Sequence, residues 1–200
     1  MKRCILLVAL FGTLLSLAGL LACGGGGGGG GAAGGSSSIR LSLVYTDPPP
    51  AAGYRFVSDA LLSTPTHLVL NLVGPDGGRG RGVAFALDLS SGSGAVAWAM
   101  VTPGDTQYVE NILFNLGPGA PLVKTALQGQ TTLLADIFQK GPGNDQALDT
   151  PICRVALDAQ APLTAGSIPI SVVQFKVLPP TGTTLADATA ICTVGTLAVQ

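Results

Sequence analysis

Cysteines are the residues with the most evident chemistry in this sequence. Cys4 and Cys23 lie close to the N-terminus, whereas Cys153 and Cys192 lie in the last quarter of the chain. A thiol can be acylated, oxidised to a disulfide or bound to a metal. Both late cysteines fall in strand-like runs, and an even pair in an exported chain is typical of a disulfide. We predict a Cys153–Cys192 disulfide; the alternative is two unrelated buried thiols.

Other groups that could carry catalysis or hold a metal are sparse. His67 is the single histidine and is expected to be an exposed residue at a strand end, without a second ligand beside it. Glu110 is the single glutamate, so a pair of carboxylates across a cleft would have to use scattered aspartates. Asn144, Asp145 and Asp149 could offer oxygens to calcium, but their spacing does not match an EF-hand. We therefore predict no catalytic residues, metal or cofactor, and a protein that is not an enzyme.

Two tyrosines are candidate ligand-binding residues. Tyr54 and Tyr108 could stack on a sugar ring, and Tyr54 is expected to be the more exposed of the two because it lies between Gly53 and a charged arginine. Trp98 alternates with alanines in a strand-like run, which favours a place in the core.

The N-terminal residues have the pattern of an export signal. A cationic start, Met1-Lys2-Arg3, precedes an apolar run over 4–21, and small Ala22 stands before Cys23. These are the parts of a secretory signal peptide. Leu20-Leu21-Ala22-Cys23 resembles the lipobox of bacterial lipoproteins. The resemblance implies removal of residues 1–22 and a diacylglycerol on the Cys23 thiol. The alternative is that 4–21 stays as a membrane-spanning helix.

This resemblance also implies a location. A lipidated Cys23 would hold the chain on membrane lipid in the bacterial cell envelope. Gly24 stands where an aspartate would imply retention in the inner membrane, so the outer membrane is favoured over the inner membrane. Residues 24–38 are only glycine, alanine and serine, and 23–38 are therefore predicted to be a lipidated linker with a flexible span of roughly 20 Å.

The remaining residues, 39–200, are enough for one ordinary domain. Without residues 1–22 the chain keeps eight basic and eleven acidic side chains, with no basic stripe. A sparse and slightly negative charge excludes nucleic acid as an expected partner.

Apolar residues in this domain alternate with polar or small ones, which is typical of half-buried strands. Residues 131–139 are apolar on both faces and are expected to form a central strand. Short strands with frequent Gly and Pro turns and no sustained helical period predict an all-β fold, a single antiparallel β-sandwich of the jelly-roll or cohesin-like kind. The expected strands cover 39–45, 67–73, 83–89, 96–100, 122–127, 131–139, 153–157, 168–177 and 190–199; 54–62 and 108–116 could be strand or helical turn.

Four segments of the domain resemble those of cohesin-type modules: 82–89, 151–159, 164–170 and the closing 195–199. The resemblance implies a non-catalytic module that binds a protein partner of the envelope or acts as a scaffold. The alternative is a carbohydrate-binding module that meets a polysaccharide at the cell surface.

Overall fold

The computed structural model describes residues 41–200, apart from 51, 90–93, 115–121, 140–144 and 161. The predicted signal peptide, Cys23 and the linker lie outside these residues. Within the described part of the chain, no helix has both the length and the apolar character needed to span a membrane.

The described chain is all-β, as the alternation of side chains predicts, and a short 3-10 turn, η1 (Thr189–Ile191), is its one helical element. The strands form four sheets. Their bounds are β1 (Leu43–Thr46), β2 (Tyr54–Ser58), β3 (His67–Val73), β4 (Arg79–Gly80), β5 (Gly82–Asp88), β6 (Val96–Ala99), β7 (Val109–Asn111), β8 (Leu122–Gln128), β9 (Thr132–Phe138), β10 (Gln146–Ala147), β11 (Pro151–Ala159), β12 (Gly166–Ile168), β13 (Ser171–Leu178), β14 (Ala186–Asp187), β15 (Cys192–Thr193) and β16 (Thr196–Val199).

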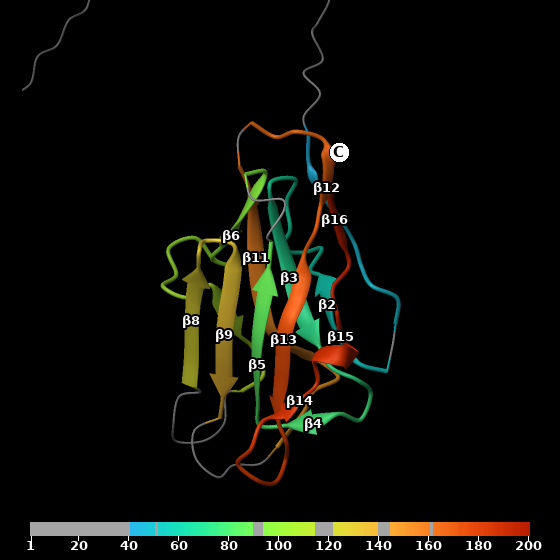
Figure 1. Ribbon diagram of the computed structural model, residues 1–200, viewed down its shortest axis with the longest axis vertical. Helices are drawn as coiled ribbons and strands as arrows, with labels where there is room; N and C mark the ends of the chain where they lie inside the picture. The colour runs from blue at the N-terminus through green and yellow to red at the C-terminus, as the bar shows by residue number, and fades with distance from the viewer. Residues whose placement is uncertain (1–40, 51, 90–93, 115–121, 140–144, 161) are drawn as a thin grey trace, which may run out of the picture. The chain divides into compact units, whose positions relative to one another are not determined.

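The two larger sheets contain most of the core. One has the strand order β15-β2-β3-β11-β6, with β7 also paired to β11, and the other has the order β14-β13-β5-β9-β8. Figure 1 shows β5, β9 and β13 in front of β3 and β11. Aromatic side chains connect the two sheets: the rings of Phe56 and Phe85 are 5.5 Å apart, and those of Tyr54 and Phe175 are 4.6 Å apart.

Strand β9 shows how the sequence pattern sets its place. It pairs with β5 on one side and β8 on the other, so it is an interior strand, as the two apolar faces of 131–139 predict. Leu133, Ala135 and Ile137 are almost fully buried, whereas Asp136 on the opposite face is exposed. One face of β9 therefore packs in the core and the other belongs to an outer surface.

Two features of the sheets differ from the expected single antiparallel arrangement. First, β1, β16 and β12 form a small sheet of their own, because β1 ends before the proline run 48–50, which cannot donate ladder hydrogen bonds. Second, β15 pairs with β2 in parallel. The 3-10 turn η1 directly precedes β15, which lies at the edge of the sheet beside β2.

The predicted Cys153–Cys192 disulfide is not present, because both cysteines are free and buried. Cys153 lies in β11 and Cys192 in β15, and the strand order places β2 and β3 between them. Three steps of about 4.8 Å separate such strands by roughly 14 Å, whereas a disulfide needs Cα atoms about 4.4–6.8 Å apart. Of the two alternatives, the structure has the two buried thiols.

We expect these thiols to make the folded state less stable at high pH. Burial raises the pKa of the Cys153 thiol, and it raises that of Cys192 to about 12. Above the ordinary thiol value of 9.0 the unfolded chain loses protons that the folded chain keeps. The contribution of the protonated thiols to the free energy of unfolding is therefore complete below about pH 9. It is lost as the pH rises toward 12, by about 1.4 kcal/mol per pH unit for each thiol.

Urea unfolding of the wild type and of a Cys153→Ala/Cys192→Ala variant, between about pH 8 and pH 11, measures this dependence. The variant should show a flatter decline, because its unfolded state has no thiol protons to lose at these positions. Equal slopes for the two proteins would contradict the assignment. Burial, the main cause of the raised pKa of Tyr54, is common to both proteins and cancels in the comparison, whereas the smaller contribution of Cys192 to that pKa is lost with the cysteine.

Candidate functional site

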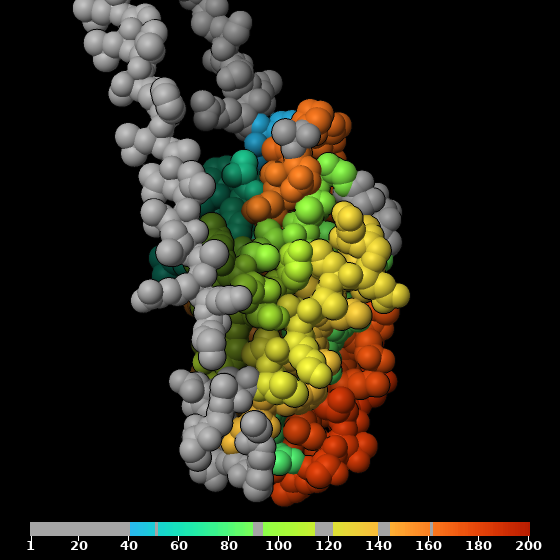
Figure 2. Space-filling model, turned by 90° about the vertical axis from the view of Figure 1, so that its left-hand side faces the viewer, coloured from blue at the N-terminus to red at the C-terminus, as the bar shows by residue number. Residues whose placement is uncertain are grey.

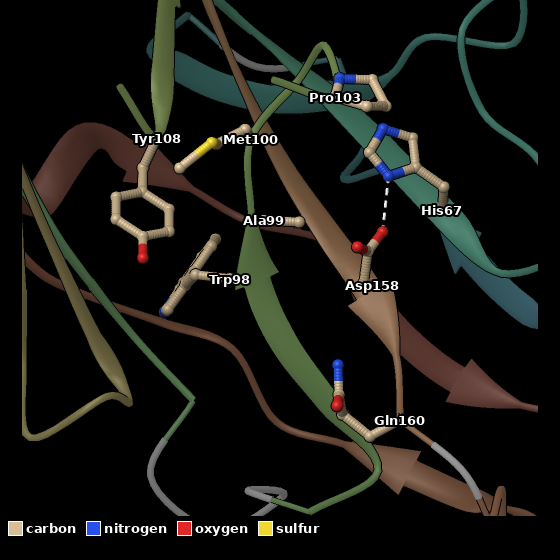
Figure 3. Close-up of a pocket in the computed structure, with 8 residues that line it drawn as sticks. All are labelled: His67, Trp98, Ala99, Met100, Pro103, Tyr108, Asp158 and Gln160. Atoms are coloured by element: carbon tan, nitrogen blue, oxygen red, sulfur yellow. Dashed lines mark hydrogen bonds and ion pairs between the residues drawn. The ribbon is translucent and has the colours of Figure 1, made fainter. Parts of the chain in front are cut away.

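A pocket of about 320 Å³ lies at the open edge of β6. In Figure 3 the β6 ribbon passes between Tyr108, Met100 and Trp98 on one side and His67 and Asp158 on the other, and Gln160 stands near one end of the strand. Five of the pocket's eight lining residues have aromatic or apolar side chains, and three have polar ones. The residues that line it are His67, Trp98, Ala99, Met100, Pro103, Tyr108, Asp158 and Gln160.

The pocket arises from the way β6 and β7 share one neighbour. Ala99 in β6 pairs with Ala156, and Val109 in β7 pairs with Val155, so the two short strands follow one another along the same edge of β11. The intervening segment 100–108 has to leave the sheet. Figure 2 shows this side of the molecule, with β8 in yellow. The backbone N–H of Tyr108 donates to Thr125 Oγ1 of β8 at 3.3 Å, which holds the end of the segment in place.

His67 and Asp158 form the polar side of the pocket. They lie directly opposite each other on β3 and β11, and Nδ1 of His67 is 2.6 Å from Oδ1 of Asp158. The other ring nitrogen, Nε2, is 3.3 Å from the carbonyl oxygen of Val101. Since a carboxylate and a carbonyl both accept, both nitrogens donate only when the ring is protonated. The imidazole thus joins the strand pair to the segment that forms the rim.

The exposure expected for His67 is wrong, because only 21% of its side chain is accessible and it has a carboxylate partner. The partner is 91 residues away in sequence, so no local spacing could reveal it. Asp158 is more open, with 49% of its side chain accessible. Figure 3 shows its second carboxylate oxygen turned away from His67 and toward the Trp98 side of the pocket.

Trp98 lines the pocket but is almost fully buried, so its ring offers no exposed face for stacking. It is 5% exposed, as expected for a core residue, and its indole N–H donates to the carbonyl of Thr131 at 2.7 Å. Tyr108 is only half-buried. Of the two rings, Tyr108 is therefore the one whose face a ligand could contact.

Tyr54, the other tyrosine predicted to bind a ligand, is in the core and not at this site. It is 6% exposed, it packs on Phe175, and burial raises its pKa. The expected exposure of Tyr54, which rests in part on the preceding Gly53, is wrong. Gly53 permits close backbone approach, since a Cβ there would stand 2.0 Å from the carbonyl oxygen of Ile191. That approach is what covers Tyr54.

Asp145, one of the residues considered for calcium, is engaged with an arginine instead. The Arg79 side chain hydrogen-bonds the carboxylate of Asp145, which lowers the pKa of that carboxyl group, and Arg79 Nη2 also donates to the Asp145 carbonyl at 3.1 Å. Asn144 lies outside the described residues. No group of three or more His, Cys, Asp or Glu side chains within the described ranges could hold a metal ion.

A second polar group, which the sequence did not reveal, fixes the strands beside the pocket. Arg154 of β11 donates to Asn71 Oδ1 and to Glu110 Oε2, both at 3.1 Å, and its Nε is 3.3 Å from Asp59 Oδ2. Burial alone would raise the pKa of Asp59, but hydrogen bonds from Asn71, Leu61 and Leu62 lower it. These contacts tie β7 to β11 and thereby anchor the C-terminal side of the 100–108 segment.

The residues that line the pocket include no evident nucleophile. Its lining contains no serine, threonine, cysteine or lysine. No family model, curated protein or solved structure matches the chain. Both resemblances, to lipoproteins and to cohesin-type modules, therefore rest on the quoted sequence segments.

Proposed function

We propose that the protein is a lipid-anchored, non-catalytic binding protein of the bacterial cell envelope, on the outer rather than the inner membrane. Its two larger sheets would form a β-sandwich of the cohesin-like kind, an arrangement supported by the ring contacts of Phe56 with Phe85 and of Tyr54 with Phe175. Cys23 would carry the lipid, and the pocket at the edge of β6 would bind a carbohydrate.

The observation that carries the carbohydrate assignment is the combination of Tyr108, Asp158 and Gln160 around one pocket. The apolar C–H face of a sugar ring packs on an aromatic ring, while its hydroxyl groups donate to a carboxylate and exchange hydrogen bonds with an amide. A volume of about 320 Å³ is at the lower end of small-molecule sites, and it suits a short saccharide.

His67 has a positioning role in this proposal. Its contact to Oδ1 restrains the Asp158 side chain, which is otherwise half-exposed and free to change rotamer. A restrained carboxylate loses less conformational entropy when it meets a hydroxyl group, so the pair favours binding. The pocket thus favours the carbohydrate alternative over the envelope protein partner.

A glycan array probed with the purified chain tests the assignment. We expect retention on at least one saccharide, a loss of about tenfold or more in affinity for Tyr108→Ala, and near wild-type affinity for Tyr108→Phe, which keeps the ring. Asp158→Asn should also weaken binding, because the amide has one accepting oxygen in place of two and lacks the negative charge that strengthens hydrogen bonds from hydroxyl groups. Absence of any retained glycan, or equal retention by Tyr108→Ala, would contradict the proposal.

A further inference from the structure

A second pocket, of about 590 Å³, lies next to the pocket at the edge of β6. Gln160 lines both pockets. Ala97 of β6 and Thr131, in the turn between β8 and β9, also line the second pocket. The indole N–H of Trp98, which lines the first pocket, donates to the carbonyl oxygen of Thr131 at 2.7 Å. The shared side chain and this hydrogen bond make the two pockets neighbours along β6.

Two glutamine amides line the second pocket. Gln130 and Gln160 are both exposed, and neither side-chain amide has a hydrogen-bond partner among the residues that the structure describes. An amide offers two N–H donors and one accepting oxygen, so it can both donate to and accept from the hydroxyl groups of a sugar. Both amides can therefore bind a ligand without breaking a hydrogen bond inside the protein.

The backbone at Gln130 has a conformation that this residue type seldom adopts. Its φ is 64°, and that of the preceding Gly129 is 60°. Two successive positive φ angles are typical of a tight hairpin turn, in which glycine and asparagine are the preferred residues. Within the described ranges, Gln130 is the one residue other than glycine with a positive φ. Such strained positions concentrate at functional sites, and this one belongs to the lining of a pocket.

The charges around the two pockets favour a neutral ligand. None of the described residues that line the second pocket is charged. In the first pocket the acidic side chain is Asp158, and His67 is already paired with it. A carboxylate or sulfate group on a sugar would therefore meet no free cation in the second pocket and a like charge in the first. A saccharide that carries only neutral polar groups needs no such partner, because amides satisfy its hydroxyl groups.

We propose that the site binds an extended, neutral saccharide chain that runs from Tyr108 past Gln160 to Gln130. This inference rests on the carbohydrate function proposed above. The first pocket, of about 320 Å³, would hold a short saccharide, and the second, larger pocket would hold the sugar units that follow. Both volumes lie in the range of small-molecule sites. The affinity should therefore rise with the length of the chain until both pockets are filled.

A length series of oligosaccharides tests this inference. The purified chain is applied to an array of neutral and acidic homo-oligosaccharides, each present from the disaccharide to the hexasaccharide, and the affinities for the best-retained series are measured by titration calorimetry. We expect a neutral series to be retained and its hexasaccharide to bind about tenfold or more tightly than its disaccharide. Retention of no saccharide at any length would overturn the proposed function and this inference together. Equal affinity for the two lengths, or stronger retention of an acidic series, would overturn this inference alone.

A variant at Gln130 then tests the path of the chain. Gln130→Gly removes the amide but suits the backbone, because glycine adopts a positive φ without steric cost. We expect it to narrow the difference in affinity between hexasaccharide and disaccharide by about two- to tenfold, the effect of one hydrogen bond. The matched control is Gln128→Ala, an exposed glutamine of the same hairpin that does not line the pocket, and it should leave both affinities unchanged. An unchanged difference for Gln130→Gly, or an equal effect of Gln128→Ala, would contradict the proposed path.

Discussion

Truncation of Phe56 to alanine is expected to lower the free energy of unfolding by about 3–5 kcal/mol. Phe56 lies in β2, is fully buried, and presents its ring to the edge of Phe85 from the facing sheet. Its loss leaves a cavity between two sheets whose backbones are fixed by ladder hydrogen bonds, so neighbouring side chains can fill it only in part.

Urea unfolding measures this effect, with the midpoint and slope both recorded. Leu61→Ala is the control, because that side chain is 96% exposed and its truncation should change stability by less than about 0.5 kcal/mol. A loss of under about 1 kcal/mol for Phe56→Ala would mean that the two sheets do not pack through this residue. Since domains of this size are stable by only about 5–15 kcal/mol, the variant should lose a large part of its stability.

Substitution of Cys23 by serine is expected to move the protein from the membrane pellet to the soluble fraction. The reason lies in the anchor: each buried CH₂ of an acyl chain contributes roughly 0.8 kcal/mol, and a diacylglycerol carries many of them. A serine hydroxyl in place of the thiol would not receive the lipid, so the anchor would be lost completely.

Cys4→Ser is the matched control, because Cys4 lies in the segment predicted to be removed and its variant should remain in the pellet. A Cys23→Ser protein that stays with the membrane would support the alternative of an uncleaved spanning helix over 4–21. Density-gradient fractionation of the wild type then separates the two membranes, and recovery with the inner membrane would contradict the expected outer-membrane location.

The longer strands could be predicted from the sequence. In β9 the alternation of side chains follows burial directly, whereas β3 and β5 are buried on both faces. For all three strands the expected ranges agree with the observed bounds to within about two residues. The shortest strands could not be predicted, since β4 and β10 have two residues each and exist only because Arg79-Gly80 meets Gln146-Ala147. A pairing over such a distance has no local signal.

The binding pocket illustrates the same limit. Tyr108 could be selected as an aromatic in a polar segment, whereas the His67–Asp158 pair depends on the register of β3 with β11. Once that register is known, the pair can be derived from it, because His67 lies directly opposite Asp158. The false disulfide had the same origin: Cys153 and Cys192 each occupy strand-like runs, but their separation is set by how many strands lie between them.

The pairing of β1 with β16 has a mechanical consequence. These strands run antiparallel, with Leu43 opposite Val199, and hydrogen bonds between Ser42 and Gln200 extend the ladder to the end of the chain. The segment that enters the domain and the segment that leaves it therefore emerge side by side. A pulling force applied between these two points would open the ladder one hydrogen bond at a time, like a zipper, instead of loading all the bonds together in shear. A fusion partner attached after Gln200 would thus load the domain along its mechanically weakest direction.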